Sequence, residues 1–168
     1  MLSKSINPSF LHNEMNKDFL SSVPYFIGWR LVRALPEKSA YSIFEKIGKI
    51  VLSRNGAQMK RLRSNLQRVV PGNGPDAMDK LMRDAVSSSM RYWCDTFRCS
   101  DWSKSRISTT VTATREDLLT APMKDGRGVV IALPHAGNWD HAGFYFCGMG
   151  FPLVTVAERL KPEALFQR

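Results

Sequence analysis

The sequence predicts an α/β fold in which amino-terminal helices precede a largely parallel sheet with helices packed on it. Apolar residues recur at helical spacing through most of the first hundred positions. Two later apolar segments, 129–133 and 153–157, are typical of buried strands, and a helix expected at about 138–147 would join them as a βαβ unit. The chain of 168 residues, 43% of them hydrophobic, is long enough for one sizeable core, so a single domain over 1–168 is expected.

The first part of the chain is expected to be helical. Residues 1–20 are polar and aperiodic, which predicts a flexible arm. A broad apolar helix follows from Tyr25 and ends at Pro36, because proline disfavours helical geometry in the residue before it. Three more helices are predicted in order: an amphipathic helix that begins at Ser39, the most basic helix at 57–70, and a long core helix at 76–98.

The second part alternates predicted strands and helices. Apolar residues alternate with polar ones from Ile107 to Ala113, which predicts a strand. Thr114 and Asp117 have the spacing of a capping box, with Thr114 as the N-cap of a short helix that ends by 125–126. The strand at 129–133, the helix from about 138 to 147 and the strand at 153–157 complete the order.

The net charge of +9 is unevenly distributed. Residues 1–70 hold 12 Lys and Arg against 4 Asp and Glu, whereas residues 71–168 hold 12 against 11. This asymmetry indicates a polyanionic partner, either nucleic acid or an anionic membrane surface. No nucleic-acid-binding motif is present, and aromatic residues near the basic segments favour a membrane, so no nucleic-acid partner is expected.

The cysteines and the hydropathy limit the cellular setting. Three cysteines without a C-x-x-C pair support neither a disulfide framework nor a structural zinc site, and a reducing cytoplasm fits them best. No window approaches 18 apolar residues, so neither a membrane span nor a signal peptide is predicted. Peripheral attachment at the cytoplasmic face of the cell membrane is the expectation, through residues Trp29, Lys60, Arg61, Arg63 and Arg68.

His135 and Asp140 are the predicted catalytic pair. His135 follows the predicted strand at 129–133, and ligand clefts of open α/β folds lie at the carboxyl ends of strands. Imidazole is a natural base near neutral pH. Asp140 would lie far round one continuous helix from His135, but a turn between them would let the carboxylate hold the imidazole by a hydrogen bond.

The segment His135 to Asp140, His-Ala-Gly-Asn-Trp-Asp, resembles the H-x-x-x-x-D motif of glycerolipid-type acyltransferases, in the form found in the lipid A lauroyl and myristoyl acyltransferases. Further stretches make the chain similar to the phosphatidylinositol mannoside acyltransferases of actinobacteria: Gly28 to Pro36, Arg54 to Gly56, Leu62 to Val70, Arg91 to Trp93 and Thr155 to Glu163. Members of that family are longer. The chain is therefore expected to be the amino-terminal part of such an enzyme, incomplete at its carboxyl end and inactive alone.

The resemblance implies a reaction and a set of residues. An acyl group would pass from acyl-CoA, a co-substrate rather than a cofactor, to a mannose hydroxyl of a phosphatidylinositol mannoside, with His135 as general base and Asp140 orienting it. Amides around Gly137 and Asn138 are candidates for stabilising the oxyanion. Glu158 and Arg159 are expected to bind sugar hydroxyls and a phosphate, respectively.

Other interpretations remain open from the sequence. The acceptor could be that of another lauroyl-type lipid acyltransferase. The chain could also be a nonenzymatic basic module that binds membranes or nucleic acid. A metal site of His135, Asp140 and His141 is the least favoured hypothesis, because the sequence offers no recurrent ligand spacing and no fourth ligand, so no metal is expected.

Overall fold

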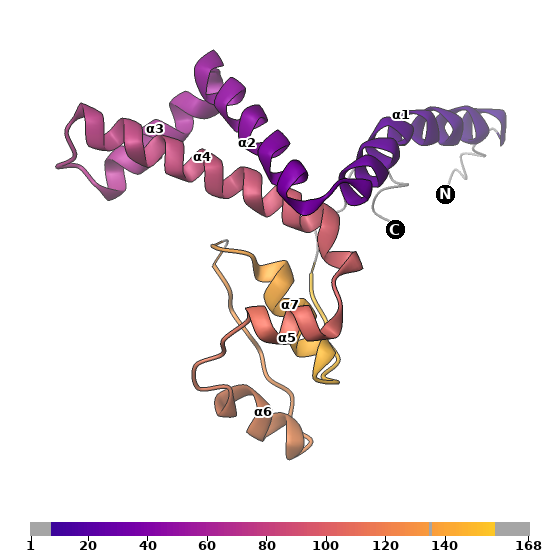
Figure 1. Ribbon diagram of the computed structural model, residues 1–168. Coiled ribbons are helices and arrows are strands. Elements are labelled where there is room, and N and C mark those ends of the chain that lie inside the picture. The colour runs from indigo at the N-terminus through magenta and orange to yellow at the C-terminus, as the bar shows by residue number, and fades with distance from the viewer. Residues whose placement is uncertain (1–7, 135, 157–168) are drawn as a thin grey trace, which may run out of the picture. The chain divides into compact units, whose positions relative to one another are not determined.

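The computed structural model describes residues 8–134 and 136–156, and for residues 8–19 only the backbone. In this part of the chain the elements follow one another as α1 (Pro8–Ala34), α2 (Glu37–Arg54), α3 (Ala57–Val69), α4 (Pro75–Arg98), the 3-10 helix η1 (Cys99–Asp101), α5 (Lys104–Thr110), α6 (Asp117–Lys124) and α7 (Trp139–Gly148) (Figure 1). The chain divides into two compact units, one of which is Leu35–Leu153 and the other of which contains α1 and residues 154–156.

The predicted helices of the first part of the chain are confirmed, but the start of the first one is wrong. α1 begins at Pro8 rather than Tyr25, within the segment predicted as a flexible arm, and ends just before Pro36 as expected. The flexibility of residues 1–20 and the single domain over 1–168 stay predictions. Among the described residues, no helix combines the length and the apolar character needed to cross a membrane.

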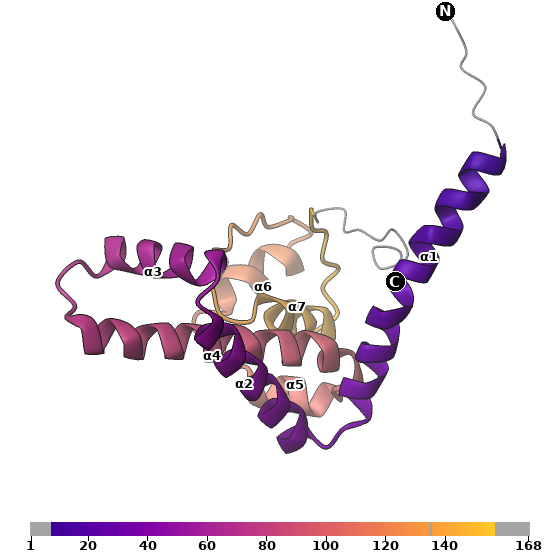
Figure 2. The ribbon, with the colours of Figure 1, turned by 90° about the horizontal axis from the view of Figure 1, so that it is seen from above.

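Local signals set the ends of α2, α3 and α4. Asn55 closes α2 in the left-handed conformation at φ 44°, one that asparagine tolerates better than most residues. Gly56 then precedes α3, and Gly74 with Pro75 opens α4, where a proline at the first helical position leaves no amide unpaired. α3 and α4 lie side by side (Figure 2).

The core of the Leu35–Leu153 unit follows one stripe of α4. Met78, Met82 and Val86 are spaced four residues apart and are 2–5% exposed, and Cys94 continues the same buried side. Residues four apart share one face of a helix, so this face of α4 is the one that the neighbouring helices cover. The long helix predicted at 76–98 is therefore a core helix, as predicted.

α2 approaches α4 closely at a glycine. A Cβ atom added at Gly48 would lie 2.9 Å from Met90 Cγ and 3.3 Å from Val86 Cγ1, both shorter than an ordinary carbon–carbon contact. Ala40, fully buried, lies two turns earlier on α2. Small residues on this face of α2 let the two helix backbones come together, which fixes α4 against α2.

The predicted largely parallel sheet is wrong. Residues 8–134 and 136–156 contain no strand. The segments 129–133 and 153–156 are nonhelical but do not pair, and Val130, Val154 and Val156 are almost fully exposed. An apolar, β-branched run forms a strand only where a neighbouring strand accepts and donates its backbone hydrogen bonds, so the residue pattern alone was not sufficient.

The strand predicted at 107–113 is also wrong. Residues Lys104–Thr110 form α5, and Ser103 caps it by accepting a hydrogen bond from the Arg106 amide at 3.1 Å. Thr109 and Thr110 donate their hydroxyls to carbonyls of the preceding turn. Such hydroxyls bond back to the helix they stand in, so alternating threonines are compatible with helical structure as well as with a strand.

The predicted capping box fails, although the helix that it would open exists. Glu116, not Thr114, precedes α6 and makes no side-chain cap bond. Arg115 instead takes a left-handed conformation at φ 59° and donates two hydrogen bonds of 3.1 Å to the Asp117 carboxylate. α6 ends at Lys124, before the predicted turn at 125–126.

Candidate functional site

The motif turn is built by Gly137 and Asn138. Gly137 has φ 65°, a left-handed conformation that favours glycine because most side chains would be strained there. Asn138 follows as the N-cap of α7, and its Oδ1 accepts a hydrogen bond of 3.0 Å from the His141 amide. These two residues turn the chain from the extended segment before the motif into α7, as the turn hypothesis requires.

Asp140 lies in the first turn of α7, where the helix dipole favours a negative charge. Its Oδ2 accepts a hydrogen bond of 3.0 Å from the Tyr92 hydroxyl and a longer one of 3.4 Å from the Thr96 hydroxyl. Tyr92 and Thr96 are one helical turn apart on α4. A part-buried carboxylate of the motif is thus tied to the long core helix.

Tyr92 is positioned by aromatic neighbours and stays protonated at neutral pH. Its ring meets Trp93 edge-on at 5.6 Å between centroids and lies 6.5 Å from the ring of Trp139. Burial raises the pKa of the Tyr92 phenol above its usual range, and the hydrogen bond to Asp140 raises that pKa further. The phenol therefore remains a hydrogen-bond donor to the carboxylate.

His141 belongs to a second set of contacts, between α7 and α5. Its Nε2 lies 3.1 Å from the Thr110 hydroxyl, and its ring meets the Trp102 ring edge-on at 4.9 Å. The Arg106 guanidinium lies 4.4 Å from the centroid of Trp102 and forms an ion pair with Glu37 of α2. The hydrogen bond with Arg106 lowers the pKa of Glu37, so the pair stays charged. The role of His141 in this structure is to join α5 and α7.

The predicted site residues are only partly within the described chain. Asp140, Gly137 and Asn138 lie together at the start of α7. The other three, His135, Glu158 and Arg159, lie outside the described residues. The hypothesis of a metal site that includes His135 lies outside them as well. Tyr92 and Thr96 were not predicted as site residues. Their spacing of four residues indicates that they share one face of a core helix. It does not indicate that this face contacts Asp140, which is 44 residues after Thr96 in the sequence.

The four basic residues predicted to contact a membrane lie on α3, and the predicted aromatic anchor Trp29 lies on α1. Lys60, Arg61 and Arg68 are exposed. Arg63 is half-buried and forms an ion pair with Asp79 of α4, which holds the pKa of that carboxyl below its usual range. Three of the four charges are therefore directed to solvent, and the fourth holds α3 on α4.

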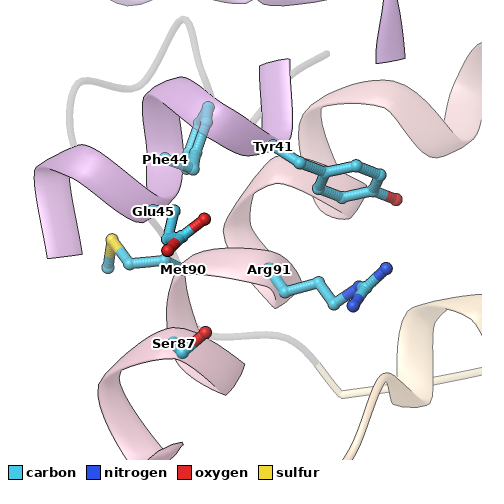
Figure 3. A pocket seen from close by; sticks show the side chains of 6 residues that line it. All are labelled: Tyr41, Phe44, Glu45, Ser87, Met90 and Arg91. Atoms are coloured by element: carbon cyan, nitrogen blue, oxygen red, sulfur yellow. The ribbon is translucent and has the colours of Figure 1, made fainter. Parts of the chain in front are cut away.

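A hollow of about 130 Å³ lies between α2 and α4, and no residue of the motif lines it. Six side chains line it: Tyr41, Phe44, Glu45, Ser87, Met90 and Arg91 (Figure 3). Arg91 lies 4.9 Å from the centroid of the Tyr41 ring, and the Tyr41 hydroxyl donates a hydrogen bond of 2.5 Å to Asp95. Burial and that bond raise the pKa of Tyr41 to about 12. These contacts fasten α2 to α4 beside the hollow.

Comparison with known proteins gives consistent matches. The family model of the bacterial lipid A biosynthesis acyltransferases matches residues 4–168. A phosphatidylinositol mannoside acyltransferase of Mycolicibacterium smegmatis is 42% identical over 149 residues, which are 89% of this chain and 48% of the relative. One of Mycobacterium tuberculosis is 40% identical over 147 residues, 86% of this chain and 46% of the relative. The chain spans about half the length of these curated relatives.

Proposed function

This chain belongs to the bacterial lipid A biosynthesis acyltransferase family, and we propose that the protein transfers a long-chain acyl group from acyl-CoA to a mannose hydroxyl of a phosphatidylinositol mannoside. The two mycobacterial relatives are named phosphatidylinositol mannoside acyltransferases, and identities of 40–42% support the same acceptor class. The matches cover 86–89% of this chain. The proposed lipid acceptor is therefore based on similarity to the mycobacterial relatives, and the proposed chemistry is based on the motif at 135–140.

In the proposed reaction, His135 removes the proton of the mannose hydroxyl as its oxygen attacks the thioester carbonyl of acyl-CoA. The carbon–sulfur bond then breaks, an ester forms, and the imidazolium returns the proton to the leaving thiolate of coenzyme A. Asp140 orients the imidazole and stabilises its charged form. Amides of Gly137 and Asn138, at the amino end of α7, are suited to stabilise the oxyanion. Glu158 and Arg159 are assigned to the sugar hydroxyls and a phosphate.

The observation that carries this proposal is the placement of Asp140. Its carboxylate lies at the start of α7, directly after the left-handed turn at Gly137, and two hydroxyls from α4 hold it. A solvated surface aspartate would not need such partners. A fixed carboxylate five residues after a histidine is suited to orient that histidine as a base.

Acyl transfer by the full-length protein tests the proposal. With palmitoyl-CoA and a purified phosphatidylinositol mannoside, we expect an acylated glycolipid by mass spectrometry and stoichiometric release of coenzyme A. Phosphatidylinositol without mannose is the matched acceptor control and is expected to give no product. Equal acylation of both acceptors would contradict a mannose acceptor, and coenzyme A release without any acylated lipid would contradict acyl transfer.

The same proposal places the protein on the cytoplasmic face of the cell membrane as a peripheral protein. The excess of positive charge in residues 1–70 supports it, together with the exposed Lys60, Arg61 and Arg68 on α3. Each basic side chain near an anionic bilayer contributes about 1 kcal/mol to binding. Trp29 on α1 is assigned as an interfacial anchor.

Reversal of Lys60, Arg61 and Arg68 to glutamate is expected to weaken binding to vesicles that contain anionic lipid by about tenfold or more. The cause is loss of attraction to the headgroups, which is screened over about 8 Å at physiological ionic strength. Arg63 is left in place because it pairs with Asp79. Cosedimentation measures the effect, and reversal of the exposed Arg83, Lys104 and Lys124 is the charge-matched control. Equal loss in both variants would contradict a role specific to α3.

A further inference from the structure

Two hydroxyl groups from α4 reach the same oxygen atom of Asp140. The Tyr92 hydroxyl donates to Oδ2 at 3.0 Å and the Thr96 hydroxyl at 3.4 Å. Thr96 also donates to the Tyr92 carbonyl at 3.0 Å, so its hydroxyl is shared between the helix and the carboxylate. Neither bond to Asp140 uses Oδ1. Both hydrogen bonds therefore hold the carboxylate through the same oxygen.

Both hydroxyls stand on the helix that contributes most to the core of this unit. Between Tyr92 and Thr96, Cys94 is fully buried, and α4 supplies most of the core of its unit. A side chain fixed to a core helix keeps its geometry better than one fixed to a loop. Asp140 stands on the short helix α7, which has no buried residue of its own, so the two bonds join a motif residue to a core helix.

We propose that Tyr92, assisted by Thr96, is a positioning residue that fixes the Asp140 carboxylate for its role in the catalytic pair. This inference rests on the proposed function, in which His135 is the base. Hydrogen bonds to a charged carboxylate are stronger than those between neutral groups. They hold Asp140 in one rotamer and keep it a charge acceptor while the imidazolium forms. The shorter bond makes Tyr92 the larger contributor.

The contribution of the Tyr92 hydroxyl can be tested separately from that of the Tyr92 ring. The ring packs beside Trp93 and Trp139, and a phenylalanine would preserve both of these aromatic contacts. The raised pKa of Tyr92 keeps its hydroxyl protonated over the neutral range, which is consistent with a permanent donor rather than an acid or base in the reaction. Tyr92→Phe therefore removes the donor and little else.

In the full-length protein, Tyr92→Phe is expected to lower kcat for acyl transfer about tenfold and to change KM for acyl-CoA less than about twofold. Thr96→Val is expected to lower kcat by a smaller factor than Tyr92→Phe. Thr96→Ser keeps a hydroxyl and is expected to have near-normal kcat. Tyr41→Phe is the matched control, because it also removes a phenol that donates to an aspartate of α4, and its kcat is expected to stay normal. Thermal melting of each variant detects a loss of folding.

A double-mutant cycle separates positioning from a structural effect. If Tyr92 acts through Asp140, Tyr92→Phe will cost little further activity in an Asp140→Asn background. A full additional tenfold loss there, or an unchanged kcat for Tyr92→Phe alone, would overturn the inference. Absence of acyl transfer in the unmutated protein would instead contradict the proposed function. If Tyr41→Phe lowered kcat as much as Tyr92→Phe, the loss would come from reduced stability and not from positioning of Asp140, which would also overturn the inference.

Discussion

His135→Ala should reduce acyl transfer by roughly 10²- to 10⁴-fold, the usual contribution of a positioned general base. Asp140→Asn should lower turnover more than it weakens substrate binding, because an amide in place of the carboxylate cannot stabilise the imidazolium. Steady-state assays of the full-length protein with acyl-CoA and the mannoside lipid measure both effects. Binding to anionic vesicles should be unchanged in either variant, since the basic residues of α3 are untouched.

The matched control for this prediction is His141→Gln. His141 stands next to Asp140 but contacts Thr110 and Trp102, so its loss should leave turnover within a few-fold of normal. Near-normal turnover of His135→Ala or Asp140→Asn would show that the reaction does not use a histidine–aspartate pair. A loss for His141→Gln as severe as that for His135→Ala would favour the three-ligand metal hypothesis instead.

Met82→Ala is expected to lower the free energy of unfolding by about 2–5 kcal/mol, the usual range for truncating a buried methionine. Met82 is 2% exposed and is one of the largest fully buried side chains among the described residues. α4 carries most of the core residues there, so little other packing can compensate for the cavity. Urea denaturation of the protein, followed by circular dichroism, measures the change.

Met149→Ala serves as the control for the core prediction. Met149 is 40% exposed, directly after the end of α7, and truncation at such a position usually changes stability by less than about 0.5 kcal/mol. Similar losses for Met82→Ala and Met149→Ala would contradict the assignment of the α4 stripe as the core of this unit.

The sequence predicted the helices well because their signals are local. Apolar spacing located both ends of α3 and α4 to within one residue and the start of α2 to within two, and Pro36 marked the end of α1. The start of α1 at Pro8 was missed, since the apolar pattern begins only at Tyr25. The strands failed because a strand depends on partners distant in sequence. Val130 and Val154 have high β propensity, yet no described segment pairs with them. For 107–113, a short alternating pattern also fits a helix, and Ser103 decided the outcome as its cap.

In the candidate site, too, the features set by local sequence could be predicted and the contacts between distant residues could not. The turn at Gly137 and the helix start at Asn138 could be predicted because glycine and asparagine are the residues that such a turn needs. The partners of Asp140 could not, since Tyr92 reaches it from another helix, 48 residues earlier. A pattern along one helix predicts its buried face but not which distant carboxylate a hydroxyl on that helix will meet.

The turn before α7 also bears on how this motif would change in evolution. Gly137 and Asn138 shape the backbone, since one supplies a left-handed conformation and the other caps the helix. A duplicated gene copy released from selection for catalysis would be free to lose His135 and Asp140, but the Gly-Asn pair would still be favoured because it begins the helix. Decayed copies should therefore be recognisable by a preserved Gly-Asn between two altered motif ends.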